Sequence, residues 1–113
     1  MPDKVAASRT ARPVAERRAR SRLTQLVSAQ GLMRGTLQVR QRACGKPNCK
    51  CARGELHESL YLIVSEQGRS RQLFVPKDWE ARVREWVENH RAAREFMEEI
   101  SRIYWDKVRQ RKA

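Results

Sequence analysis

Three cysteines and one histidine lie within residues 44–57 of this 113-residue chain, and this cluster constrains the fold more than any other feature. The spacing is C-x4-C-x-C-x5-H. Thiolate and imidazole suit tetrahedral zinc, and Cys3His sets are common in structural sites. Gly45, Pro47 and Gly54 allow the tight turns that bring such ligands together. The cluster therefore predicts a structural Zn²⁺ site with the ligands Cys44, Cys49, Cys51 and His57.

Other interpretations of the cluster stay open. The chain has no C-x2-C knuckle, so the cysteines and His57 can also be unrelated to one another. An iron–sulfur cluster would need His57 in place of a fourth thiolate. Without metal, C-x-C thiols near lysines would suit a redox sensor. A catalytic zinc would keep one coordination position open, whereas all four candidate ligands here are committed.

The formal charge of +12 is concentrated near the N-terminus. Residues 1–42 carry ten Lys and Arg against two acidic residues, whereas residues 77–113 carry ten against eight. A localised excess of positive charge is typical of a protein that binds a polyanion. A basic surface that only keeps the protein in solution is the alternative.

Residues 1–12 have few large apolar side chains, and we expect a disordered basic arm. A helix is predicted over residues 13–30, between Pro13 and the stop signal Gly31. On a helical wheel its two faces differ. One carries Ala19, Leu23, Leu26 and Gln30, and the opposite one carries Arg17, Arg18 and Arg22.

Period-two patterns predict a small antiparallel sheet over residues 33–75. In the first strand Leu37 and Val39 point to one face and Thr36, Gln38, Arg40 and Arg42 to the other. The apolar runs 60–64 and 71–75 flank a glycine-containing turn at residues 66–69 and indicate a hairpin. Because residues 60–64 are apolar on both faces, we expect them in the central strand.

A long amphipathic helix is predicted over residues 77–110, which contain neither glycine nor proline. We interpret Trp79 and Trp86 as core residues, and His90 as a packed histidine on the same face. Such a helix outreaches a three-stranded sheet, so part of its apolar stripe needs the N-terminal helix or a second copy as partner. The stripe comprises Trp79, Val83, Trp86, Val87, His90, Ala93, Met97, Ile100, Tyr104 and Val108, widened by Phe96 and Ile103.

The fold class is therefore α+β, with an N-terminal helix, a three-stranded sheet bearing a zinc loop at 44–57, and a long C-terminal helix in one small domain over residues 13–113. No apolar run has the length of a membrane span or a signal peptide. We expect a cytoplasmic protein that does not insert into membranes.

The motif Cys-Gly-Lys-Pro-Asn-Cys-Lys-Cys-Ala-Arg-Gly-Glu-Leu-His, with Arg34-Gly35-Thr36-Leu37 before it and Leu60-Tyr61-Leu62 after it, resembles a small bacterial domain family without an assigned activity. The resemblance covers about residues 33–100. It departs at Glu58-Ser59, where that family tends to have Gly-Pro. It implies a metal site at the cysteine–histidine core and a gene position near transposases and other mobile elements.

We expect a nucleic-acid-binding accessory protein with structural zinc, with DNA favoured over RNA. Paired carboxylates, a nucleophile elbow and a phosphate-binding glycine loop are all missing from the sequence, so we predict no enzyme. The alternative is a protein-interaction adaptor or homodimer that uses the long helix. The predicted phosphate-binding residues are Arg17, Arg18, Arg22, Arg40, Arg42, Lys46, Lys50 and Arg53.

Overall fold

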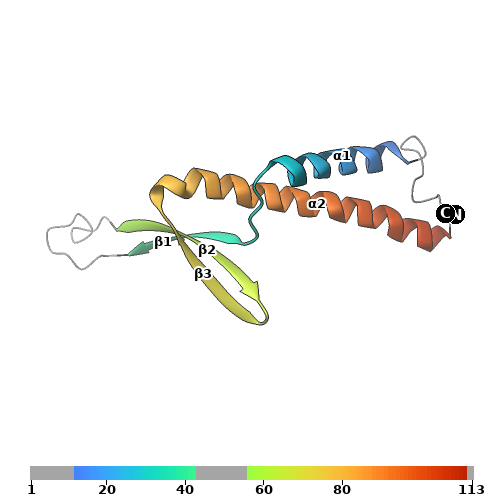
Figure 1. The fold of residues 1–113 in the computed structure, drawn as a ribbon. Helices are drawn as coiled ribbons and strands as arrows, with labels where there is room; N and C mark the ends of the chain where they lie inside the picture. The colour runs from blue at the N-terminus through green and yellow to red at the C-terminus, as the bar shows by residue number, and fades with distance from the viewer. Residues whose placement is uncertain (1–11, 43–55, 112–113) are drawn as a thin grey trace. The chain divides into compact units, whose positions relative to one another are not determined.

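The computed structural model describes residues 12–42 and 56–111, and these form the predicted α+β fold (Figure 1). Contacts group the chain into two compact units, one of residues 33–88 and the other of residues 1–32 together with 89–113. The expected disordered arm, apart from Arg12, lies outside the described residues, as do the three cysteines.

The first unit, residues 33–88, contains a three-stranded antiparallel sheet. Its strands are β1 (Thr36–Arg42), β2 (His57–Glu66) and β3 (Arg69–Val75), in the order β1-β2-β3. The prediction that residues 60–64 lie in the central strand is confirmed. Leu60 pairs with Val39 on one side and with Val75 on the other.

A two-residue turn joins β2 to β3, as the glycine-containing pattern predicts. Gln67 and Gly68 both have positive φ angles, 51° and 78°. Two consecutive residues of this kind define the type I′ turn, whose twist matches that of the flanking strands. The turn fixes the register, so Tyr61 lies opposite Phe74.

Gly35 starts the first strand where no larger residue fits. Its φ is 147°, and a Cβ atom placed there would lie 2.7 Å from Cδ1 of Leu62. The backbone nitrogen of Met33 donates a hydrogen bond of 3.0 Å to the carbonyl oxygen of Trp86. The chain that leads into β1 therefore lies close to the central strand at Gly35 and is hydrogen-bonded to α2 at Met33.

One face of the sheet is covered by the first turns of helix α2 (Glu80–Gln110). The side chains of Leu60, Leu62 and Val75 point to this face and pack with Val83 of α2. Partly buried residues complete this core, namely Met33, Leu37, Trp86 and Val87.

Trp79 is not a core residue, and this part of the prediction is wrong. The helix α2 does not start at Lys77, because residues Lys77–Trp79 form a 3-10 turn closed by the Trp79 nitrogen and the Pro76 oxygen at 2.9 Å. This turn leaves Trp79 41% exposed. Its ring lies 6.0 Å from that of Trp86 and carries the guanidinium of Arg82 at 4.3 Å.

The second unit contains the helix α1 (Val14–Ala29) beside the later part of α2, seen as blue and orange ribbons in Figure 1. The two helices run antiparallel, since Glu16 contacts Tyr104 while the carbonyl oxygen of Gly31 accepts a hydrogen bond from Asn89. Ala19 and Ala93 are buried in this unit.

The predicted apolar stripe of α2 is only partly covered in this unit. Phe96, Ile100 and Ile103 are half-buried, whereas Met97 and Val108 are 56% and 74% exposed. A helical wheel cannot show this difference, because it does not say which of these side chains a neighbouring element covers. Within residues 12–42 and 56–111, no helix is long and apolar enough to cross a membrane.

Candidate nucleic-acid interface

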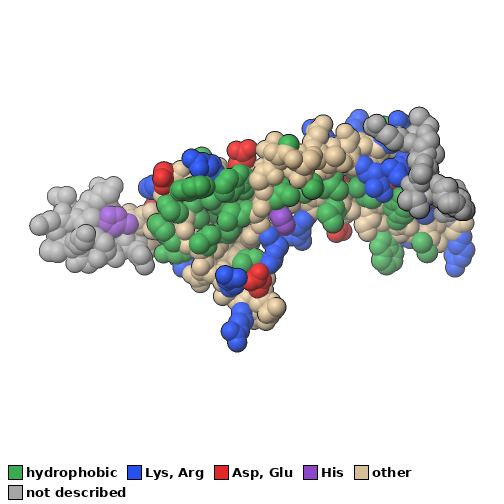
Figure 2. All heavy atoms as spheres, viewed as in Figure 1, with side chains coloured by type: hydrophobic (Ala, Val, Ile, Leu, Met, Phe, Trp, Pro, Cys, Tyr) green, Lys and Arg blue, Asp and Glu red, His purple; other side chains and the backbone are tan. Residues whose placement is uncertain are grey.

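Three predicted arginines, Arg17, Arg18 and Arg22, lie on α1. Arg18 and Arg22 are exposed and Arg17 is half-buried, while Ala19 on the opposite side is buried. Of the other residues of the predicted apolar face, Leu23 and Leu26 are half-buried and Gln30 is exposed. Figure 2 shows Lys and Arg side chains along α1. Among the described residues, none of the three arginines has an acidic partner within salt-bridge distance.

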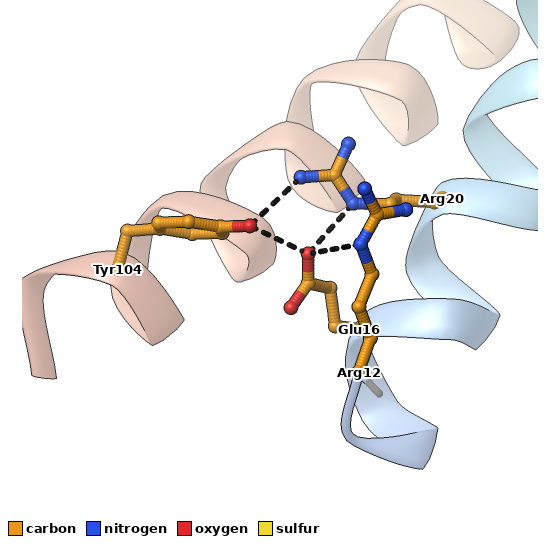
Figure 3. A network of polar contacts seen from close by, with 4 residues as sticks. All are labelled: Arg12, Glu16, Arg20 and Tyr104. Atoms are coloured by element: carbon orange, nitrogen blue, oxygen red, sulfur yellow. Dashed lines mark hydrogen bonds and ion pairs between the residues drawn. The ribbon is translucent and has the colours of Figure 1, made fainter. Parts of the chain in front are cut away.

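Glu16, the one acidic residue of α1, is fully buried and paired with other groups (Figure 3). Its Oε2 accepts hydrogen bonds from Nε of Arg20 at 2.7 Å and from the hydroxyl of Tyr104 at 2.9 Å. Nε of Arg12 lies 3.6 Å from the same oxygen. Glu16 therefore pairs with Arg12 and Arg20, offsets one of their two positive charges, and leaves the predicted arginines without an acidic partner among the described residues.

Burial alone would raise the pKa of Glu16, because a carboxylate loses hydration there. The hydrogen bonds from Arg20 and Tyr104, together with the charges of Arg20 and Arg12, lower the pKa below its ordinary value of 4.5. The hydrogen bond to Glu16 in turn raises the pKa of Arg20. Both groups are consequently charged at neutral pH.

A hollow on α1 is lined by residues that carry hydrogen-bond donors. Arg17 is one of them, and its Nε atom is buried without a hydrogen-bond partner among the described residues. A buried donor without an acceptor costs free energy. The residues that line the hollow are Arg12, Arg17, Arg20, Ser21, Thr24 and Gln25.

The fourth predicted arginine, Arg40, lies on the sheet in the other unit. Its guanidinium sits 4.4 Å from the centre of the Tyr61 ring. It donates hydrogen bonds to the side-chain oxygens of Gln38 at 3.0 Å and of Gln72 at 2.8 Å. Arg40 thus reaches from β1 over the central strand to β3.

Only one candidate zinc ligand, His57, is described. It is the first residue of β2, is half-buried, and pairs with Arg42 in the register. The three cysteines lie outside the described residues, so the zinc site stays a prediction. The other predicted site residues without described side chains are Arg42, Lys46, Lys50 and Arg53.

Several residues of these surfaces were missing from the sequence-based prediction. Arg12 and Arg20 flank Glu16 at spacings of four, which is a recognisable helix ion-pair signal. Tyr61 and Phe74 lie on the same sheet face as Arg40, and their rings are 5.7 Å apart. That proximity follows from the register of the β2–β3 hairpin.

Fold and site together define a small α+β protein with an arginine-rich surface on a helix and an arginine–aromatic cluster on one face of a sheet. The sequence model of a family described as a domain of unknown function (DUF6788) matches residues 13–85. The chain therefore belongs to this family, and the matched segment includes α1 and the whole sheet. No curated protein and no solved structure matches the chain.

Proposed function

We propose that the protein is a nucleic-acid-binding accessory protein whose sheet carries a structural zinc site. The observation that supports binding most directly is the donor-lined hollow on α1, beside which Arg18 and Arg22 are exposed and have no acidic partner among the described residues. Phosphate oxygens would accept hydrogen bonds from the donors of the hollow, and Arg18 and Arg22 would extend the contact along the backbone. Such contacts give affinity without reading sequence and need no catalytic residue.

The register of the sheet supports the zinc part of the proposal. Because Arg42 and His57 are paired, the segment that holds the three cysteines begins and ends at neighbouring positions of β1 and β2. A metal bound by Cys44, Cys49, Cys51 and His57 would close this connection and fix the lysines and arginine that it carries. The family resemblance of the cysteine–histidine core further implies a gene position near a mobile element, and we propose that the protein acts as an accessory to such an element.

Removing the three charges of Arg17, Arg18 and Arg22 tests where nucleic acid binds. We expect the wild-type protein to bind a labelled 20-bp duplex with micromolar or tighter affinity, measured by fluorescence anisotropy over a salt series. The triple alanine variant should weaken binding. It should also make log affinity fall less steeply with log salt, with a slope smaller in magnitude by about 3, since each phosphate contact contributes about 0.9.

A second triple variant, Arg91→Ala, Arg94→Ala and Arg102→Ala, is the matched control. It removes the same net charge from a surface of α2 that also carries Glu95, Glu98 and Glu99. The control should keep most of the affinity and slope. Equal losses in both variants would show that binding follows net charge and not the α1 surface. No binding at low salt would rule out the proposed function.

A second function, dimerisation through α2, is favoured by the exposed edge of its apolar stripe. Met97, Ser101, Tyr104 and Val108 follow the alternating spacing of four and three residues that a coiled coil uses. Trp105 and Val108 are 69% and 74% exposed. Figure 2 shows apolar side chains projecting from this part of α2. A second copy of the chain would present the same stripe and cover it.

Sedimentation velocity tests this alternative. We expect the wild-type protein to sediment as a dimer at about 10–100 μM, in the range of weak helical pairs. Trp105→Ala with Val108→Ala should shift it to a monomer because these are the two most exposed large apolar side chains of α2. Arg94→Ala with Arg102→Ala, on the charged side of the helix, should stay dimeric. A wild-type monomer throughout this range would contradict the alternative.

A further inference from the structure

The sheet has a second face, opposite to the one that α2 covers. Side chains alternate along a strand, so Tyr61, between Leu60 and Leu62, points to this second face. Its cross-strand partners Gln38 and Phe74 point to the same face. Phe74 is 52% exposed there. The residues with described side chains whose strand positions belong to this face are Thr36, Gln38, Arg40, His57, Ser59, Tyr61, Ile63, Ser65, Ser70, Gln72 and Phe74.

Arg40, Tyr61 and Phe74 form a continuous aromatic and cationic cluster at the middle of this face. The guanidinium of Arg40 lies over the Tyr61 ring, and the Phe74 ring meets the Tyr61 ring edge-on, with an interplanar angle of 67°. Two hydrogen bonds hold the guanidinium in place. The half-exposed guanidinium and the exposed Phe74 ring are flat groups on which another planar group can stack.

Polar groups next to this cluster are arranged as donors. Gln38 and Gln72 each use the side-chain oxygen to accept a hydrogen bond from Arg40. Their amide NH2 groups have no hydrogen-bond partner among the described residues. They are therefore suited to donate to carbonyl or phosphate oxygens of a ligand.

The acidic strand residues occupy the opposite face. Glu58 and Glu66 both fall on the alternation of Leu60 and Leu62, and they pair with Gln41 and Arg69 across the sheet. The face that carries Arg40 is thus cationic without a compensating carboxylate among its described strand residues. This charge favours a polyanion over an apolar peptide or a second copy of this basic chain.

We propose that this sheet face binds single-stranded nucleic acid by stacking unpaired bases on Phe74 and on the Arg40–Tyr61 pair. The inference rests on the proposed function and specifies its substrate. Bases in a duplex are already stacked and paired, whereas bases of a single strand expose their planar faces. Gln38 and Gln72 would donate hydrogen bonds to the same strand, and Arg40 would offset its charge.

The full-length protein should bind a labelled 20-nucleotide oligo(dT) or oligo(U) about tenfold more tightly than an abasic 20-mer with the same phosphates. The abasic strand separates base stacking from phosphate contact. Comparing oligo(dT) with oligo(U) shows whether the protein prefers single-stranded DNA or single-stranded RNA. Fluorescence anisotropy at one fixed salt concentration measures all three affinities.

Phe74→Leu should lose this preference for strands with bases, and Phe74→Trp should keep or increase it. Leu73→Ala is the matched control, because Leu73 is also 52% exposed and adjacent in β3 but points to the other face. Circular dichroism checks that each variant is folded. Phe74 lies outside the buried core of Leu60, Leu62 and Val75, so these variants should fold.

The outcomes separate this inference from the proposed function. Equal affinity for the abasic strand, or an unchanged preference in Phe74→Leu, would overturn the stacking proposal while duplex binding through α1 still stands. A loss in Leu73→Ala equal to that in Phe74→Leu would also overturn it. Failure to bind any of these nucleic acids at low salt would overturn both.

Discussion

Replacing Glu16 by alanine is expected to lower the free energy of unfolding by about 2 kcal/mol. The carboxylate is fully buried, and its Oε2 accepts two hydrogen bonds, one of them from a charged guanidinium. Hydrogen bonds to charged groups contribute more than neutral ones. The buried Oε1 has no hydrogen-bond partner among the described residues, and this cost limits the net contribution.

Urea unfolding followed by circular dichroism measures the effect of Glu16→Ala. Glu95→Ala is the matched control, since Glu95 also pairs with an arginine four residues away on a helix, but both side chains are more than half exposed. An exposed pair contributes only about 0.3–0.5 kcal/mol. Similar losses in the two variants would contradict the role of the buried Glu16 contacts.

The contribution of Glu16 also depends on pH, with a definite sign. Its folded-state pKa lies below the ordinary value of 4.5, so the folded protein holds the carboxylate charged more strongly than the unfolded chain does. The stabilisation is complete above about pH 4.5 and is lost as the pH falls through the lower folded-state pKa. Glu16→Gln should remove this part of the acid sensitivity, and an identical acid profile in that variant would contradict the assignment.

Much of the sheet could be predicted from sequence because period-two alternation and turn chemistry act locally. Leu60 to Val64 are apolar on both faces, which placed them in the central strand. The two-residue turn at Gln67 and Gly68 sets the register, so the proximity of Tyr61 and Phe74 was available from the sequence. Counting residue pairs from the turn along both strands gives the Tyr61–Phe74 pair.

The helical surfaces were harder to predict because burial depends on which partner covers a face. A wheel groups Met97, Ile100 and Val108 together, but Ile100 is half-buried whereas Met97 and Val108 are exposed. Glu16 lies next to Arg17 in the sequence, yet its contacts are with Arg12, Arg20 and Tyr104. The contact with Tyr104 joins residues at distant sequence positions, so no local pattern shows it.

Removing the proposed zinc is expected to unfold the β-hairpin, and Cys49→Ser should have the same effect. Structural zinc contributes roughly 10–16 kcal/mol of apparent binding free energy in zinc-finger peptides, which makes this the largest effect expected. The first unit has a small core built around Leu60, Leu62, Val75 and Val83. Such a core would leave little stability to offset the loss of the proposed metal.

Elemental analysis of the purified protein should find about one zinc per chain, since one Cys3His set fills four coordination positions. Chelation under reducing conditions should then reduce the strand signal in circular dichroism. His57→Asn should lower the zinc content, whereas His90→Asn, which changes the half-buried histidine of the other unit, should not. An unchanged spectrum after verified removal of the metal would contradict a structural role, and iron with sulfide in place of zinc would identify a different cofactor.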